Sequence, residues 1–200
     1  MLISNQAGRA SILNRLKAFG ITTEKTDKRI DELLALIKNR ELEGFAYDSA
    51  EASFELLALR MFGKLPEFFT LNNFRVITER RHNAKGELVT FSEAKVDLSI
   101  HQEKYLTIAE GDGPVQALYF AMTKALNGKY PSIRNFHLQD YKVRIIDPKK
   151  EVGAKTRVQI EGCNGNNQHK FTTIGVSSNI IDASYEALSD SFKYSLFRLV

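Results

Sequence analysis

Residues 108–126 read IAEGDGPVQALYFAMTKAL, and the fold can be worked out from this stretch. A strand-like apolar run leads into two glycines around an acid, then a proline, then an amphipathic helical pattern. Pro114 suits the first position of a helix, where its missing N–H is not needed. The small Ala117 and Ala121 let such a helix approach a sheet closely. The stretch therefore predicts a strand that turns tightly into a helix packed on a sheet.

The same arrangement recurs in residues 171–192, FTTIGVSSNIIDASYEALSDSF. Aligning Ala117 with Ala183 and Ala121 with Ala187 gives an offset of 66 residues. Segments of alternating apolar and polar residues precede each helix: 74–78, 94–100 and 105–109 in the first half, and 141–145 and 158–160 in the second. Between the first two of these segments, Asn83 to Gly86 is a hairpin turn signal, with a glycine able to take positive φ. The pattern predicts an internal duplication of β-β-β-α units. This is an α+β fold with sheets covered on one side by helices, whose apolar faces suggest pairing with a second copy.

The first third of the chain has a helical period instead. Apolar residues at helical spacing predict three helices, the second capped by Thr26 or Asp27 and the third by Asp48 in a capping box with Glu51. Residues 63–66, GKLP, break this pattern. We therefore expect helical linker subdomains in 1–65 and a dimerisation domain in 66–200, with repeats at about 66–131 and 132–200.

Composition excludes several classes of protein. A hydrophobic content of 43% with 26% charged residues is typical of a globular chain and argues against disorder. The net charge of +4 is too small and too dispersed for a nucleic-acid binder, and the densest basic cluster, Arg80 to His82, is expected to be a solvated strand end. Cys163 is the single cysteine, so it can form no disulfide within the chain. No apolar run is long enough to cross a bilayer, and we expect a cytoplasmic protein.

The residues do not predict a catalytic site. The four histidines lack the spacing of a metal site. No lysine follows EGDG, and Glu110 and Asp112 would repel a phosphate. Each repeat helix nevertheless begins with N–H groups and a partial positive charge that could receive one small carboxylate. In the second repeat, Ser177, Ser178 and Asn179 stand at this turn and are good capping residues. These turns can equally be helix starts with no ligand.

Six segments, taken together and in order, resemble the C-terminal half of the 2-isopropylmalate synthase and citramalate synthase family, with SNQAGR and AEASFELL nearer to the citramalate branch. They are SNQAGRAS (4–11), SAEASFELL (49–57), FFTLNNFRVITERR (68–81), EGDGPVQAL (110–118), DYKVRI (140–145) and TIGVSSNIIDASYEAL (173–188). The resemblance covers nearly the whole chain.

The resemblance implies a larger enzyme. In that family a (β/α)8 barrel condenses acetyl-CoA with pyruvate using a divalent metal, so both cofactors are expected in a barrel absent from these 200 residues. Linker helices and a duplicated regulatory domain follow the barrel. The regulatory domain forms a homodimer and binds an end-product amino acid, leucine or isoleucine. We therefore expect a non-catalytic fragment with no cofactor of its own, without nucleic-acid or membrane partners.

The resemblance also implies an effector pocket. Its expected residues are Gly113, Pro114, Val115, Gln116, Leu138, Tyr141, Ile145, Ala154, Ser178, Asn179 and Ile180. The aliphatic members suit a branched side chain, although Leu138 and Ile145 could equally be ordinary core residues. The loop PKKEVGAK (148–155) departs from the alanine-rich run common in the family. We expect feedback inhibition by isoleucine; the alternatives are leucine binding, as in a 2-isopropylmalate synthase, and a purely structural dimerisation domain.

Overall fold

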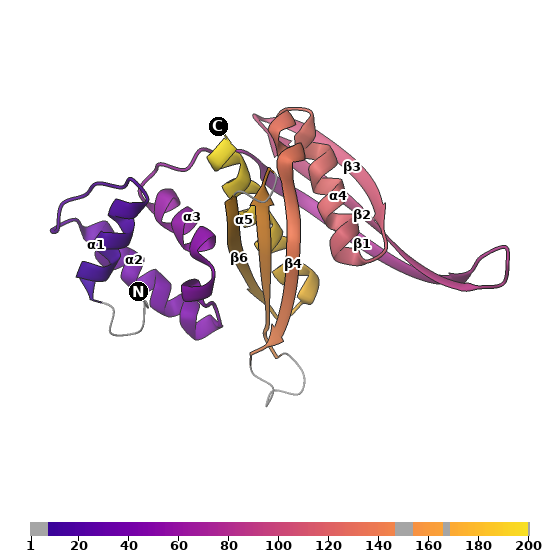
Figure 1. Cartoon of the computed structure of the whole chain (residues 1–200), viewed down its shortest axis with the longest axis horizontal. Helices are drawn as coiled ribbons and strands as arrows, with labels where there is room; N and C mark the ends of the chain where they lie inside the picture. The colour runs from indigo at the N-terminus through magenta and orange to yellow at the C-terminus, as the bar shows by residue number, and fades with distance from the viewer. Residues whose placement is uncertain (1–7, 147–153, 166–168, 200) are drawn as a thin grey trace. The chain divides into compact units, whose positions relative to one another are not determined.

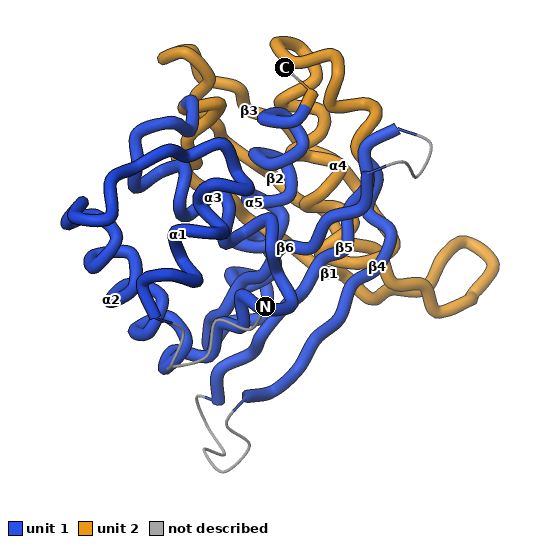
Figure 2. Tube along the Cα trace, turned by 60° about the vertical axis from the view of Figure 1, so that its left-hand side comes forward, with its two compact units in different colours: residues 1–66, 137–198, 200 blue, residues 67–136, 199 orange. Residues whose placement is uncertain are grey.

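The computed structural model describes residues 8–146, 154–165 and 169–199. These residues form two three-stranded sheets, with strand orders β1-β2-β3 and β4-β5-β6. They divide into two compact units, coloured separately in Figure 2: unit 1 joins residues 1–66 to 137–198, and unit 2 contains 67–136. The helical segment thus belongs to the same unit as the second repeat. The predicted assignment of roles to 1–65 and 66–200 stays a prediction.

Unit 2 is one β-β-β-α repeat. It contains β1 (Thr70–His82), β2 (Leu88–Ile100), β3 (Glu103–Gly111), α4 (Pro114–Asn127) and a 3-10 turn, η2 (Pro131–Asn135). Figure 1 shows α4 along one face of this sheet. The predicted alternation in β2 is confirmed, because Ala94, Val96, Leu98 and Ile100 are fully buried. The alanines of α4 are equally buried, as close helix–sheet packing requires.

The β1–β2 hairpin extends beyond the third strand. β3 pairs with β2 only from Ser92 to Ile100, so residues 79–82 and 88–91 form a two-stranded ribbon. Its turn is the predicted one: Asn83 Oδ1 accepts from the N–H groups of Lys85 and Glu87, and Gly86 has a φ of +78°. A left-handed residue at this position is what a short hairpin turn favours.

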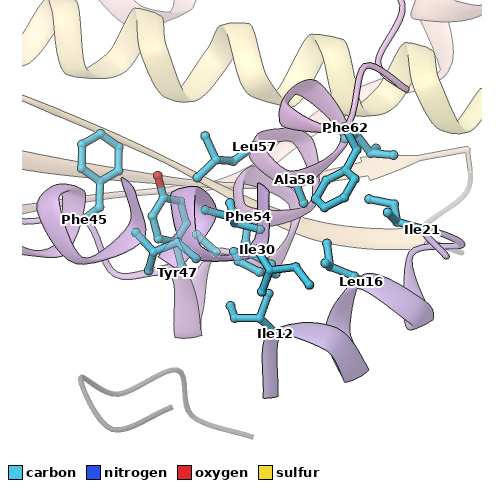
Figure 3. Packing of buried hydrophobic residues seen from close by; sticks show 14 of the residues in the cluster. Ile12, Leu16, Ile21, Ile30, Phe45, Tyr47, Phe54, Leu57, Ala58 and Phe62 are labelled. Carbon is cyan, nitrogen blue, oxygen red and sulfur yellow. The ribbon is translucent and has the colours of Figure 1, made fainter. Parts of the chain in front are cut away.

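Unit 1 combines the second repeat with the helical segment. The repeat contains β4 (Phe136–Ile145), β5 (Thr156–Asn164), β6 (His169–Ser177) and α5 (Ile180–Leu199); the helical segment contains α1 (Arg9–Ala18), α2 (Lys28–Glu43), η1 (Tyr47–Ser49) and α3 (Glu51–Met61). Figure 1 shows α5 against this sheet and α3 beside β6. Figure 3 shows the apolar core of the helical segment, centred on Phe54.

The predicted caps are partly right. Asp27 caps α2 by accepting from the Arg29 N–H at 2.9 Å. The capping box at Asp48 is wrong, because residues 47–49 form the 3-10 turn η1 and the cap position of α3 is Ala50. A helical turn immediately before α3 places Asp48 inside that turn, two residues before the cap position.

The predicted duplication is confirmed by a hydrogen bond that occurs in both repeats. Thr107 Oγ1 donates to the Ala121 carbonyl at 2.8 Å, and Thr173 Oγ1 donates to the Ala187 carbonyl at 2.8 Å. Both residues of the second pair lie 66 positions after those of the first, the offset read from the alanine pattern. The two sheets therefore receive their helices in the same register.

Candidate functional site

Most of the predicted site residues of unit 1 lie at one end of its sheet. The Ile146 N–H donates to the Lys155 carbonyl at 2.9 Å, so the end of β4 meets the beginning of β5. Thr156, the first residue of β5, pairs with Ser177, the last residue of β6. Ile145, Ala154 and the turn 178–180 therefore lie at the same end of the sheet, where α5 begins.

The β6–α5 turn forms a capped helix start. Asn179 Oδ1 accepts from the Ile181 N–H at 2.8 Å, and the Asn179 carbonyl accepts from the Ala183 N–H at 3.0 Å. Ser177 Oγ in turn accepts from the Asn179 N–H at 3.1 Å. The predicted capping role of this turn is confirmed for Asn179. A ligand carboxylate here would meet the positive end of a 20-residue helix.

Aliphatic side chains lie exposed at the same end. Ile145 is 60% exposed and Ile180 is 44% exposed, and Val143 is exposed as well. Ile145 is therefore not an ordinary core residue in this chain. Exposed isoleucines at a strand end and at a helix start leave apolar surface that a ligand or a second copy could cover.

Tyr141 joins this end of β4 to α5. Its hydroxyl lies 2.8 Å from Ser184 Oγ, and Ser184 Oγ donates to the Ile180 carbonyl at 2.6 Å. Because the serine has only one hydroxyl proton, Tyr141 is the donor in their shared hydrogen bond. The tyrosine is thereby held against the first turn of the helix.

Arg157 lies at this end but on the other face of the sheet. Ile160 pairs with Thr173, which bonds to α5, so the alternate residue Arg157 faces the helical segment. Arg157 Nε accordingly donates to the Gly44 carbonyl at 2.6 Å. Burial, together with the neighbouring positive charge of Arg144, lowers the pKa of the Arg157 guanidinium. Arg157 therefore joins the sheet to the end of α2 and not to the start of α5.

Leu138 lies apart from the other residues of unit 1. It is the third residue of β4 and Ile145 is the last, so roughly 23 Å of extended strand separates them. Residues 147–153, which include most of the unusual PKKEVGAK loop, lie outside the described residues. The structure thus brings together Tyr141, Ile145, Ala154 and residues 178–180, and does not bring Leu138 to them.

The remaining predicted residues begin α4 in unit 2. Pro114 occupies the first turn, and Gln116 Oε1 accepts from the Asp112 N–H at 2.6 Å, which closes the turn from within. Gly111 is required here because a Cβ at that position would lie 2.6 Å from the Ala117 nitrogen. Gly113 is not required for space, since a Cβ there would meet nothing within 4 Å.

Residues 48–196 match the LeuA allosteric (dimerisation) domain family. The chain belongs to this family. Its match begins within η1 and runs through both repeats to α5, so α1 and α2 precede the matched part.

Known relatives of this LeuA-domain chain include (R)-citramalate synthases and 2-isopropylmalate synthases. It is 38% identical over 196 residues to the (R)-citramalate synthase of Synechocystis sp., covering 98% of this chain and 36% of the relative. It is 39% identical over 196 residues to that of Aquifex aeolicus, with the same coverage. It is 26% identical over 198 residues to the 2-isopropylmalate synthase of Carboxydothermus hydrogenoformans, covering 98% of this chain and 35% of the relative. The chain spans about a third of the length of these relatives.

Other kinds of site find no support within the described part of this LeuA-domain chain. No three histidine, cysteine, aspartate or glutamate side chains gather there in an arrangement that could hold a metal ion. The helices in these residues are all too short or too polar to cross a bilayer. Cys163 is buried, and its sulfur accepts from Gln139 Nε2 at 3.1 Å.

Sequence reasoning missed two contributors to the site. Val143 continues the alternation of Tyr141 and Ile145 and could have been included on that ground. Ser184 follows Ile180 by four residues and so lies on the same helix face, which the sequence also shows. The contact of Arg157 with the Gly44 carbonyl, on the other face of the sheet, could not have been found, because the two residues are 113 positions apart.

Proposed function

We propose that this chain is the regulatory, dimerising region of a citramalate synthase and that it binds isoleucine as a feedback inhibitor. Support comes from family membership and from identities of 38% and 39% to citramalate synthases against 26% to a 2-isopropylmalate synthase. The whole enzyme would condense acetyl-CoA with pyruvate in a separate barrel. The role of these 200 residues would be control of that reaction.

The observation that carries the proposal is the exposed aliphatic surface of Ile145 and Ile180 beside the first turn of α5. An α-amino acid with a branched side chain presents a carboxylate and an apolar group a few ångströms apart. The helix start suits the carboxylate, and the isoleucines suit the side chain. Fully burying one such side chain contributes about 1.5–3 kcal/mol.

We propose that the functional form is a homodimer. The exposed aliphatic side chains at the ends of β4 and α5 would then be covered partly by effector and partly by a second copy. Light scattering after size-exclusion chromatography tests this directly, with an expected mass of about twice the 22.6 kDa of one chain. A monomer at all concentrations would contradict the proposed dimer.

Effector binding is tested by isothermal titration with isoleucine, leucine and valine. Isoleucine should bind most tightly, and Ile145→Glu should weaken it about tenfold or more, because an aliphatic contact is lost and a like charge faces the carboxylate. Leu42→Glu is the matched control: Leu42 is 83% exposed near the end of α2, where Gly44 contacts Arg157 on the sheet face opposite α5, and its replacement should leave isoleucine affinity unchanged.

The outcomes separate the alternatives. Tighter binding of leucine than of isoleucine would favour a leucine-responsive region of a 2-isopropylmalate synthase. Dimers without heat for any of the three amino acids would identify a purely structural dimerisation domain. Equal loss of affinity in Ile145→Glu and Leu42→Glu would refute the location of the site.

A further inference from the structure

One stripe of α5 holds the helical segment of unit 1. Its residues follow each other at intervals of four, which places them on one side of the helix: Glu186, Asp190, Tyr194 and Arg198. Each makes a hydrogen bond to a side chain of α2 or α3. The first turn of the same helix belongs to the proposed amino-acid site.

Two of these contacts involve acids of the stripe. Glu186 Oε1 accepts from Arg40 Nη1 of α2 at 3.0 Å. Asp190 Oδ2 accepts from Ser53 Oγ of α3 at 2.8 Å. Burial raises the pKa of the Asp190 carboxyl, against the lowering effects of the Ser53 hydrogen bond and of the nearby Arg60. Both acids are therefore held in partly desolvated positions between the helices.

The other two contacts converge on one buried acid of α3. Tyr194 OH donates to Glu55 Oε2 at 3.1 Å, and Arg198 Nη2 donates to both Glu55 oxygens at 2.5 and 2.7 Å. Only 2% of the Glu55 side chain is exposed. A buried carboxylate is costly to leave without its partners, because the charge is then neither paired nor hydrogen-bonded. This end of α5 is accordingly an anchor.

The acids near the other end of the stripe also reach the edge of β6. The Val176 N–H donates to Glu186 Oε2 at 3.0 Å, and the Ile174 N–H donates to Ser53 Oγ at 3.0 Å. One carboxylate oxygen of Glu186 thus accepts from β6, and the other accepts from Arg40. Val176 is followed by Ser177, which accepts from Asn179 within the proposed site. Two hydrogen bonds therefore connect the residue next to that turn with α2.

Arg40 continues the connection into the core of the helical segment. Its guanidinium lies 4.7 Å from the centre of the Phe45 ring. The rings of Phe45 and Tyr47 stack at 5.7 Å, and Tyr47 meets Phe54 edge-on at 6.1 Å. These aromatic residues are labelled in Figure 3. A change in the position of Arg40 is therefore a change at the edge of the main apolar cluster.

The contact between α5 and the helical segment has room to rearrange. A cavity of about 200 Å³ lies beside the stripe, lined by side chains that include Arg40, Arg60, Glu186 and Asp190. Arg60 Nη2 is 4.0 Å from Asp190 Oδ1, a loose pair that can shorten. Well-packed interfaces tend to switch between discrete arrangements, and polar groups around a cavity provide alternative partners.

We infer that the Arg40–Glu186 ion pair transmits occupancy of the amino-acid site at the β6–α5 turn to helices α2 and α3. This inference rests on the proposed function, since it assigns the regulation of that same site. A ligand at residues 178–180 fixes the turn, and the turn fixes Val176 and Glu186. Glu186 then holds Arg40 and the aromatic residues behind it. The Glu55 anchor keeps the far end of α5 in place, so the movement is expressed at Arg40.

The test is hydrogen exchange of the intact 200-residue chain, read by mass spectrometry with and without saturating isoleucine. In the wild type, isoleucine should protect the amides of α2 and of residues 45–54 as well as those of the turn. In Arg40→Gln, protection should remain at the turn and be lost in α2. Because coupling between sites is reciprocal, isoleucine affinity should also fall, by about 5-fold or more.

Lys38→Gln is the control, since it removes one positive charge from an exposed position of the same helix and should behave as the wild type. Glu186→Gln is a second variant in case Arg40→Gln fails to fold: its amide oxygen can still accept from Val176, so it removes the charge alone. It should likewise reduce the protection of α2.

The results distinguish the two proposals. If isoleucine binds and α2 is protected equally in the wild type, Arg40→Gln and Glu186→Gln, the ion pair does not transmit the signal and the inference is overturned. If isoleucine gives no heat and no protection anywhere in the wild type, the proposed function itself fails, and this inference fails with it.

Discussion

The two repeats share their interior and differ on the outer side of their helices. Each sheet binds its helix through a threonine-to-carbonyl hydrogen bond of 2.8 Å, at positions 66 residues apart. At the same offset, however, the stripe residues Glu186, Asp190 and Tyr194 of α5 correspond to Phe120, Lys124 and Gly128 of α4. Phe120 is 43% exposed, and Gly128 is the residue at which α4 ends.

This difference shows which surface of the helix distinguishes the two repeats. The sheet-facing side of a β-β-β-α unit is constrained by packing, because a close helix–sheet contact tolerates little change in volume. The outer side is free to vary, and in the second repeat it carries polar groups that bind the helical segment. The longer α5, with 20 residues against 14, provides the extra turns on which Tyr194 and Arg198 lie.

The largest expected effect concerns the closest helix–sheet approach in each repeat. A Cβ at Gly175 would lie 2.0 Å from the Ala183 carbonyl oxygen, and one at Gly111 would lie 2.6 Å from the Ala117 nitrogen. Gly175→Ala should therefore lower the free energy of unfolding by about 3 kcal/mol, and Gly111→Ala by about 1–2 kcal/mol. Urea unfolding followed by circular dichroism measures both.

Gly113→Ser is the matched control for these substitutions, because a Cβ there meets nothing within 4 Å and serine is a good cap residue. It should be neutral or slightly stabilising. Equal losses from Gly113→Ser and Gly175→Ala would mean that the loss of glycine's flexibility, and not the close approach, decides the effect.

The second prediction concerns the hydrogen bond that the repeats share. Thr173 is fully buried, and its hydroxyl also lies 2.6 Å from Ser191 Oγ, whereas Thr107 is only half-buried. Thr173→Val should cost about 2 kcal/mol, because it leaves Ser191 without this partner, and Thr107→Val about 1 kcal/mol. The same unfolding measurements apply. A larger loss of unfolding free energy from Thr107→Val than from Thr173→Val would contradict this prediction. The two hydrogen bonds would then not be equivalent, although they occupy the same register.

Local patterns in the sequence predicted the shared part of this comparison. Alternation identified β2, the alanine spacing gave the offset of 66, and Asn83 to Gly86 marked the hairpin turn. These features depend on residues close in the chain, where periodicity and turn preferences are informative. The site at the start of α5 was partly predictable for the same reason, since the capping role of Asn179 is local.

The divergent part could not be predicted in this way. Polar residues at intervals of four on an amphipathic helix are typical of a solvated face, so the stripe of α5 gave no signal of its partners. Arg40 and Glu186 are 146 residues apart, and Arg198 and Glu55 are 143 apart. Such pairs are set by tertiary packing. Asp48 failed as a predicted cap because the chain forms a 3-10 turn there, which cap preferences do not anticipate.

The smallest expected effect concerns pH, and it tests an acid that only the second repeat carries. Burial raises the pKa of Asp190 above its ordinary value of 3.8, so the folded chain binds this proton more tightly than the unfolded chain does. Stability linked to Asp190 must therefore fall as pH rises from about 4 through the raised pKa, and stay low above it. Asp190→Asn should remove this dependence, seen as a smaller loss of unfolding free energy between pH 4 and pH 7.

Asp140 provides a control of opposite sign. The hydrogen bond from Lys142 lowers the pKa of the Asp140 carboxyl, so its contribution is present above the ordinary value of 3.8 and is lost as pH falls. The difference between wild type and Asp140→Asn should accordingly grow with pH, whereas the difference for Asp190→Asn should change in the other direction. If the differences for Asp140→Asn and Asp190→Asn changed with pH in the same direction, the cations near Asp190 would stabilise its charged form more than burial destabilises it. The stripe of α5 would then be a favourable ion network. Asp190 would not be the destabilised acid on which the capacity of the stripe to rearrange depends.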